Sequence, residues 1–230
     1  SSGSYGGAGI GGASGSSADS IAITGGKITA YGGSRAAGIG GGRGGYGTNI
    51  EITGGEVTAT GGNDPSMSSY GGAGIGGGSQ KESKVAVDTD SIKILGGIVK
   101  AFGGGCAAGI GGGRYHAANV EISGEGTQVE ATGGKNAAGI GSGGFMGSDG
   151  KTDGITKIII SAGSKVKAWG GNLAAAIGGG YGASKYNSGA EISISGKDTE
   201  VKAYGNESGP STAIGSGYRD KQTSADNQKT

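Results

Sequence analysis

The sequence is poor in the residues that build disulfide frameworks and zinc sites. Its 230 residues include one cysteine and one histidine. The single cysteine, Cys106, excludes an intrachain disulfide. His116 is the only histidine, and it lies in a different segment from Cys106, so no group of residues has the ligand spacing of a zinc site.

Long apolar runs and an excess of either charge are also missing. No apolar run reaches the roughly 18 residues of a membrane-spanning helix, and no segment has the pattern of a secretory leader. With 19 Lys and Arg against 18 Asp and Glu, and no basic stretch, the chain lacks the electrostatic footprint of nucleic-acid binding. We therefore expect neither a nucleic-acid partner nor insertion into a membrane.

Glycine is the residue in excess, at 61 of 230. So much glycine without a strict period usually indicates a low-complexity or disordered segment. Two features argue against disorder: Ile, Val and Ala recur at regular spacing, and β-branched residues dominate the apolar set. A regular repeat that hides one apolar face is typical of a solenoid, so the sequence predicts one elongated domain.

The repeated unit contains three short segments separated by glycines. The first unit reads IAITGGKITAYGG from Ile21 to Gly33, and continues as SRAAGIGGG to Gly42. A half unit, YGGAGIGG, precedes it, and later units begin at Ile50, Ile92, Val120, Ile158 and Ile192. Apolar residues alternate with period two in each segment, as in a strand with one buried face, and the glycine pairs suit corners.

These features predict an all-β fold, a parallel β-helix (β-solenoid) with three short strands per coil and about six coils. Glycine density excludes helices, because each glycine costs about 1 kcal/mol relative to alanine. The general preference for right-handed crossovers predicts a right-handed coil. We expect residues 1–4 to be a linker remnant, 5–218 the β-helix domain and 219–230 a polar tail. Insertions at 80–91 and 144–157 are predicted to lie at corners.

Stacking the units predicts columns of like residues. Inside, two columns of isoleucine begin at Ile23 and Ile39, and one of alanine begins at Ala30. The motif AAGIGGG predicts an outer face almost without side chains, to which another backbone could pack; ice binding is a weaker interpretation of it. That face is predicted to contain Gly38, Gly74, Gly109, Gly139, Ala176 and Ala213.

The outward column at the end of the second segment is the main candidate site, and we call it the aromatic column. It contains Tyr31, Thr60, Phe102, Thr132, Trp169 and Tyr204. Four of its six residues are aromatic in a chain that is only 5% aromatic. Exposed aromatic rings beside hydrogen-bonding side chains suit sugars, and the candidate polar partners are Lys100, Glu130, Lys167 and Lys202. The alternative is a ladder that stabilises the sheet or packs under a neighbouring domain.

Four other patterns give weaker candidates. The motif GIGGGR lacks the helix and the GK[ST] ending of a phosphate loop. Carboxylates at Asp88–Asp90 and Asp149–Asp153 could bind calcium, although polar loops explain them as well. Paired acids could hydrolyse glycosides, but Glu51 and Glu121 would lie two coils apart with Lys93 between them. An edge after the glycine motif gathers side chains that are frequent at recognition surfaces, although ordinary loop residues explain them somewhat better: Arg43, Arg114, Tyr115, His116, Phe145, Tyr181, Tyr186 and Tyr218.

The unit I-x-I-x-G-G-x-V-x-A-x-G-G-x-x-A-A-G-I-G-G-G, repeated over most of residues 5–218, resembles glycine-rich repeats of large secreted and wall-anchored Firmicutes proteins. These repeats are grouped loosely with parallel β-helix carbohydrate-binding modules. The resemblance implies an extracellular or cell-surface bacterial setting, neighbouring domains in a larger chain and a non-catalytic role. It carries over no defined binding residues. We expect no cofactor, with calcium at the acidic loops as the alternative.

We therefore expect a non-catalytic module that binds a host glycan or a cell-wall polysaccharide. A spacer or adhesin stalk without a small ligand, and a glycosidase or lyase domain, remain as alternatives.

Overall fold

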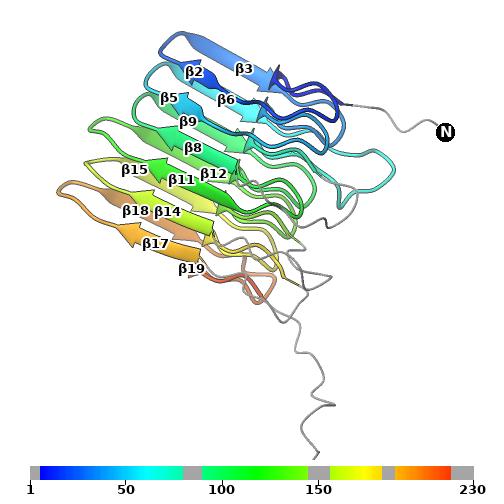
Figure 1. Ribbon diagram of the computed structural model, residues 1–230. Helices are drawn as coiled ribbons and strands as arrows, with labels where there is room; N and C mark the ends of the chain where they lie inside the picture. Colours follow the sequence, from blue (N-terminus) through cyan, green and yellow to red (C-terminus); the bar gives the residue numbers. More distant parts are fainter. Residues whose placement is uncertain (1–5, 80–89, 145–155, 183–189, 219–230) are drawn as a thin grey trace, which may run out of the picture.

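The chain winds into a stack of coils in which each strand pairs in parallel with the corresponding strand of the next coil (Figure 1). This computed structural model describes residues 6–79, 90–144, 156–182 and 190–218, and all nineteen elements formed within those ranges are strands. The predicted parallel β-helix with six coils of three strands is therefore confirmed. The strand β1 (Ile10–Gly11) is the predicted half unit at one end.

Three parallel sheets form the three sides of the coil. The first sheet contains β2 (Ile21–Ile23), β5 (Ile50–Ile52), β8 (Asp90–Ile94), β11 (Ala118–Ile122), β14 (Thr156–Ile160) and β17 (Ala190–Ile194). The second sheet contains β3 (Lys27–Tyr31), β6 (Glu56–Thr60), β9 (Ile98–Phe102), β12 (Gln128–Thr132), β15 (Lys165–Trp169) and β18 (Glu200–Tyr204). The third sheet contains β1, β4 (Ile39–Gly40), β7 (Ile75–Gly76), β10 (Ile110–Gly111), β13 (Ile140–Gly141), β16 (Ile177–Gly178) and β19 (Ile214–Gly215).

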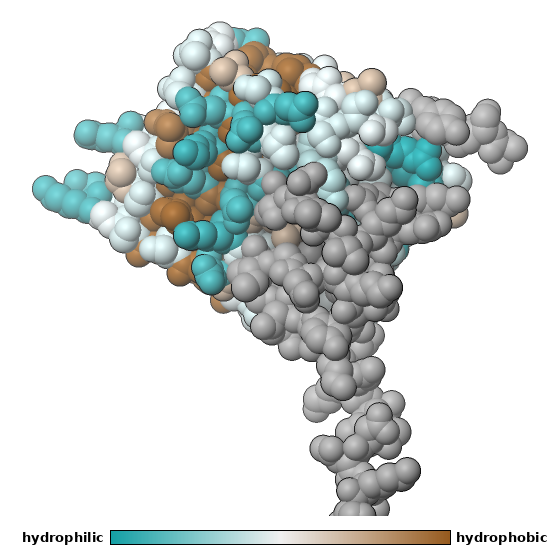
Figure 2. All heavy atoms as spheres, in the orientation of Figure 1, coloured by the Kyte–Doolittle hydropathy of each residue, from teal (hydrophilic) through white to brown (hydrophobic). Residues whose placement is uncertain are grey.

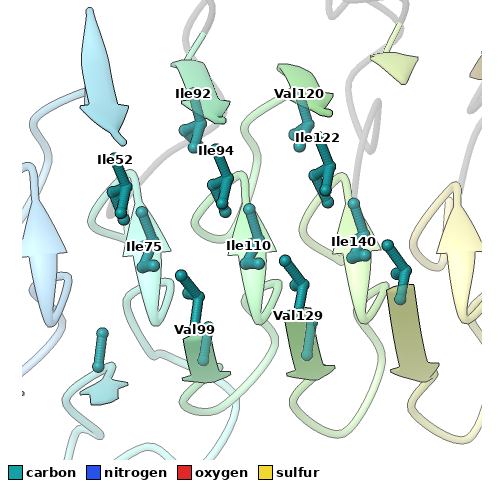
Figure 3. Packing of buried hydrophobic residues seen from close by; sticks show 14 of the residues in the cluster. Ile52, Ile75, Ile92, Ile94, Val99, Ile110, Val120, Ile122, Val129 and Ile140 are labelled. Carbon is teal, nitrogen blue, oxygen red and sulfur yellow. The ribbon is translucent and has the colours of Figure 1, made fainter. Parts of the chain in front are cut away.

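The core consists of the predicted columns of isoleucine and alanine, with a column of valine beside the alanines. Ile52, Ile94 and Ile122 follow one another in the first sheet, and Ile75, Ile110 and Ile140 follow one another in the third (Figure 3). All six are fully buried. Full burial of such a side chain contributes about 1.5–3 kcal/mol, so every coil adds a comparable increment of stability. The increment is smaller in the last coil, where Ile194 is 41% exposed and Ile214 is 45% exposed.

The third sheet differs from the prediction of a smooth outer face. Gly38, Gly74, Gly109 and Gly139 are buried, because their backbone packs directly against the ends of strands in the second sheet. A Cβ on Gly38 would come closer than 3.0 Å to the backbone of Thr60, one coil further on. Because another part of the same chain covers these positions, they have no room for a side chain. They therefore offer no open surface to a partner.

The glycine after each isoleucine of the third sheet has a second reason to be glycine. These seven glycines have φ between 129° and 137°, in the region that side-chain-bearing residues avoid. In all but the last, a Cβ would also come closer than 3.0 Å to the carbonyl oxygen of the equivalent glycine in the next coil. The recurrence of IG is thus a requirement of backbone stacking.

The edge that follows the glycine motif is also more buried than predicted. Arg114 and Tyr115 are less than a tenth exposed, and His116 is fully buried. The Arg114 guanidinium lies over the rings of Tyr70 and Tyr115, at 3.9 and 4.3 Å from their centroids. These side chains join neighbouring coils to each other, so the interpretation of this edge as a recognition surface is wrong for these three residues.

A short excursion between the second and third sheets of the second coil carries a buried carboxylate. Asp64 Oδ1 accepts a 2.6 Å hydrogen bond from the Ser66 hydroxyl, and Oδ2 pairs with Arg35 of the preceding coil. The hydrogen bonds from Ser66, together with Arg35, lower the pKa of Asp64 to about 2. The ion pair holds two coils together at this corner.

Several predicted features lie outside the described residues. They are 80–89 and 145–155 of the two insertions, with Asp88 and Asp149–Asp153, and also Phe145, Tyr186 and the segments 1–4 and 219–230. The proposed domain boundaries therefore stay predictions. In the part of the chain that the structure describes, no helix is long and apolar enough to cross a membrane.

Candidate functional site

The aromatic column forms a continuous line along the outer face of the second sheet. The register pairs Tyr31 with Thr60, Thr60 with Phe102, and so on through each coil to Tyr204. This register follows from alternation within each strand, which turns the preceding alanine inward and the aromatic residue outward. The exposed fractions of Tyr31, Phe102 and Tyr204 are 68%, 41% and 44%. The structure therefore brings the predicted aromatic residues together on one face.

Trp169 and Tyr204 form a stacked pair at one end of the column. Their ring centroids are 5.3 Å apart and their planes differ by 12°. Because rings at this separation and angle face each other, Tyr204 covers one face of Trp169. The other face is directed toward Thr132, the neighbour of Trp169 in the preceding coil. A threonine leaves more space there than an aromatic ring would.

An open groove of about 850 Å³ lies beside the stacked pair, at the corner where the second sheet ends. We call it the aromatic groove, and its side-chain-bearing walls include Thr132, Lys135, Trp169, Asn172, Tyr204 and Asn206. The Asn206 amide donates to Asn172 Oδ1 at 3.1 Å, which orients two amides on the groove wall. Aromatic faces beside amides, a hydroxyl and an ammonium group can bind a sugar ring and its hydroxyls.

Our sequence interpretation missed Lys135, Asn172 and Asn206. Each follows the glycine or glycine pair after the column residue, in TGGK, WGGN and YGN. Comparing the units at that position would have found them, because a polar residue recurs there in the last three coils. Only the fold shows that the position faces the same groove as Trp169.

The predicted polar partners form a second column on the same face, two residues before the aromatic one. Lys100, Glu130, Lys167 and Lys202 are consecutive neighbours in it. Glu130 lies 3.6 Å from the Lys100 ammonium and 3.5 Å from that of Lys167. These side chains, with Gln128 and Lys165, line a shallow depression of about 360 Å³ beside the column.

Glu200 and Lys202 form the shortest ion pair of this face, at 2.6 Å. The hydrogen bond from Lys202 lowers the pKa of Glu200, and the same bond raises the pKa of Lys202. Both groups therefore stay charged at neutral pH. Because both are exposed, their pairing contributes little to stability and leaves them able to bind a ligand.

The carboxylates considered for glycoside hydrolysis lie in charge ladders. Glu51 and Glu121 both neighbour Lys93 in the first sheet, one on each side, and Lys93 lies 3.9 Å from Glu121. In the second sheet, Glu56 lies 3.2 Å from Lys27. Opposite charges on neighbouring strands stabilise a sheet, so their arrangement is explained without catalysis.

A buried pair, Asp90 and His116, lies between the first and third sheets. Asp90 Oδ1 accepts a 2.6 Å hydrogen bond from the Gly47 amide, and Oδ2 lies 3.6 Å from His116 Nδ1. Burial raises the pKa of Asp90, and burial also raises the pKa of Cys106. The His116 ring stacks on Tyr46 at 4.4 Å. Among the described residues, no group of three or more His, Cys, Asp and Glu side chains could hold a metal ion.

Figure 2 presents one face of the molecule in the orientation of Figure 1. Strongly hydrophilic and hydrophobic residues are interspersed over the stacked strands, and the turns beside them are mostly of intermediate hydropathy, as glycine-rich turns are. No single apolar patch dominates the described part of this face.

Comparison with known proteins identifies the repeat. The profile of the family described as "Beta helix repeat" matches residues 21–43, 50–79, 92–114, 120–144 and 158–181, which is more than half of the chain. Searches of curated proteins and of solved structures returned no match. Each matched segment contains one strand of every sheet, from the first isoleucine pair to the end of the glycine motif. The chain therefore belongs to the beta helix repeat family.

Proposed function

We propose that this β-helix is a non-catalytic module that binds carbohydrate through the outer face of its second sheet. The observation that carries the proposal is the Trp169–Tyr204 pair, whose rings border a groove with polar walls. Sugar rings present apolar faces that stack on aromatic side chains, and hydroxyls that need hydrogen-bond partners.

The proposed setting is the outside of a bacterial cell, as part of a larger secreted or surface protein. The support is the resemblance of the AGIGGG units to repeats of secreted and wall-anchored Firmicutes proteins. In that setting the partner is a host glycan or a cell-wall polysaccharide, and other domains of the same protein are its neighbours.

A spacer or adhesin stalk is the second candidate function. One observation favours it: stacked aromatic residues in register also stabilise a sheet, as Trp169 and Tyr204 do across β15 and β18. A stalk predicts no affinity for any glycan and a neighbouring domain that covers the aromatic column. An enzymatic role instead predicts glycan turnover that is abolished by Glu51→Gln or Glu121→Gln.

Screening the protein against an array of glycans and polysaccharides, with and without EDTA, tests the proposal. We expect saturable binding, and at least about a tenfold loss of affinity in Trp169→Ala with Tyr204→Ala, since each aromatic ring that packs against a sugar contributes on the order of 1 kcal/mol. Met67→Ala is the control, because Met67 is 50% exposed and lies outside the face. Unchanged binding in the double variant would contradict the site, and loss with EDTA would indicate a calcium requirement.

A further inference from the structure

Three coils repeat one short pattern on the face that we propose to bind carbohydrate. Strands β9, β15 and β18 contain VKAF, VKAW and VKAY, so each places a lysine two residues before an aromatic residue. Where the column has Thr132 instead of a ring, in β12, Glu130 replaces the lysine. In these four strands the aromatic residue and the lysine therefore occur together and are absent together, whereas Tyr31 of β3 has Thr29 two residues before it.

The charges of the second sheet are divided between its two halves. In β3 and β6 the outward charges are Lys27 and Glu56, which lie 3.2 Å apart and cancel. In β9, β12, β15 and β18, four lysines and two glutamates point outward, so that half of the sheet has a net positive charge. The outward charged residues there are Lys100, Glu130, Lys165, Lys167, Glu200 and Lys202. The positive half is also the half that contains Trp169 and Tyr204.

Two lysines are direct neighbours beside the stacked pair. The register places Lys167 opposite Lys202, just as it places Trp169 opposite Tyr204. Like charges directly opposite each other on neighbouring strands are unfavourable, and Glu130 and Glu200 offset that repulsion only in part. An anion held between the two ammonium groups would offset it further.

The two lysines and the two stacked rings together span a site of the size of one charged sugar residue. They are Lys167, Lys202, Trp169 and Tyr204. Neighbouring strands lie about 4.8 Å apart, and positions two residues apart along a strand are separated by about 6.6 Å. The ring of a sugar can therefore contact the aromatic pair while a carboxylate on the same or the next residue reaches the lysines. The pattern recurs at Lys100 and Phe102, beyond the one coil that has Glu130 and Thr132 in these positions.

We propose that the ligand is an extended, carboxylate-bearing polysaccharide that runs along the stack over the VKA-aromatic units. The proposal rests on the proposed carbohydrate-binding function and names its ligand class. Aromatic side chains supply affinity for the sugar ring, and lysines select the acidic chain, in which charge-assisted hydrogen bonds to carboxylates form. A neutral chain would leave Lys167 and Lys202 with only Glu130 and Glu200 to offset their mutual repulsion.

Binding to polygalacturonate, and to the same polymer in its neutral, fully methyl-esterified form, tests this. By calorimetry at low salt, we expect the acidic polymer to bind at least about tenfold more tightly than the neutral one. Lys167→Gln with Lys202→Gln should lower the affinity for the acidic polymer to about that for the neutral one, so that the preference is lost while the glutamine amides can still bond to hydroxyls. The matched control is Lys27→Gln, a lysine of the same sheet in the neutral half, which should keep the preference.

The outcomes separate the two proposals. Equal binding of both polymers, lost in Trp169→Ala but not in the lysine variant, would keep the carbohydrate site and overturn the acidic preference. Binding of the acidic polymer that survives Trp169→Ala would mean unspecific attraction between charges and would overturn the inference as well. Binding of neither polymer would overturn the acidic preference, whereas the carbohydrate site is overturned only if the glycan array shows no binding either. A thermal unfolding midpoint that falls by no more than the few degrees expected for about 1 kcal/mol shows that the exposed substitutions leave the fold intact.

Discussion

The second and third sheets differ in what their outward-facing residues contact. On the second sheet, alternate residues point into solvent and vary from coil to coil, from Thr132 to Trp169 in neighbouring strands. On the third sheet, between its two end strands, the residues on either side of each isoleucine are glycines or alanines whose backbone is covered by the chain itself. The second sheet therefore exposes side chains to solvent, whereas the backbone of the third sheet packs against other parts of the chain.

This difference shows which part of the repeat is free to acquire function. A position where any Cβ would overlap a neighbouring backbone accepts one residue type, as at Gly111. A position directed into solvent accepts many, because surface substitutions usually change stability by less than about 0.5 kcal/mol. The monotony of AGIGGG thus belongs to the scaffold, and the variable outward residues of the second sheet are the place to look for recognition.

The largest effect is expected from adding a methyl group to the third sheet. Gly111 has φ of 132°, and a Cβ there would overlap the carbonyl oxygen of Gly141. We expect Gly111→Ala to cost more than about 3 kcal/mol, from backbone strain and overpacking together. Chemical denaturation followed by circular dichroism measures the loss.

The last coil provides the matched control for that substitution. Gly215 has φ of 135°, but nothing lies within 4 Å of a Cβ built on it. Gly215→Ala should therefore show only the backbone strain, about 1–3 kcal/mol. Equal costs at the two positions would mean that φ alone, rather than the next coil, requires glycine, and the contrast between the two sheets would weaken.

An intermediate effect on stability is expected when acid protonates Asp64, at the corner between the second and third sheets. The folded-state pKa of Asp64, about 2, is lower than the unfolded value of about 3.9. Its contribution to stability is therefore complete above about pH 4 and is lost as the pH falls through about 2. We expect Asp64→Asn to lose about 1–2 kcal/mol at pH 7 and to be less sensitive to acid than the parent protein.

The contribution of Asp90 to stability is expected to change with pH in the opposite direction. Because burial raises its pKa, its contribution to stability is present when it is protonated and declines as the pH rises above the unfolded value of about 3.9. Asp90→Asn should therefore lose less stability at pH 7 than Asp64→Asn does. Urea denaturation of both variants between pH 3 and 7 checks the two signs, and identical profiles would contradict the assignment.

The smallest effect on stability is expected at the outer face of the second sheet. Trp169→Ala removes a ring that stacks only on Tyr204, so the free energy of unfolding should fall by about 1 kcal/mol or less. A shift in the thermal midpoint as large as that of Gly111→Ala would show that the aromatic column is part of the scaffold. That result would favour the spacer over the glycan-binding module.

The repeat made much of the fold predictable from sequence. Period-two alternation identifies which residues of a unit point inward, and the alignment of units predicts the neighbours, so the columns through Ile52, Ala101 and Ile140 followed directly. The alignment of units also predicted that the rings of the aromatic column would share one face. The hand of the coil stays a prediction.

What the alignment could not predict was how the three sides meet. Period-two alternation turns Ile39 inward and Gly38 outward, and so predicts that Gly38 is exposed. In the structure the end of β6 covers Gly38. The same reasoning placed His116 on an edge, where the fold buries it against Asp90 and Tyr46. Corners bring together residues from different segments and different coils, and no periodicity within a segment describes that contact.

The sequence by itself thus determined the class of fold, the inward columns and the line of aromatic residues, because these depend on local alternation and on equality between neighbouring units. Only the tertiary structure decided that the glycine side is covered, that Trp169 stacks on Tyr204, and that Lys135 and Asn172 border the same groove. The covered glycines and the groove depend on the angles at which the three sheets meet and on distances across corners, and the stack depends on how two neighbouring side chains orient on one sheet. Such angles and distances arise from the packing of the whole coil.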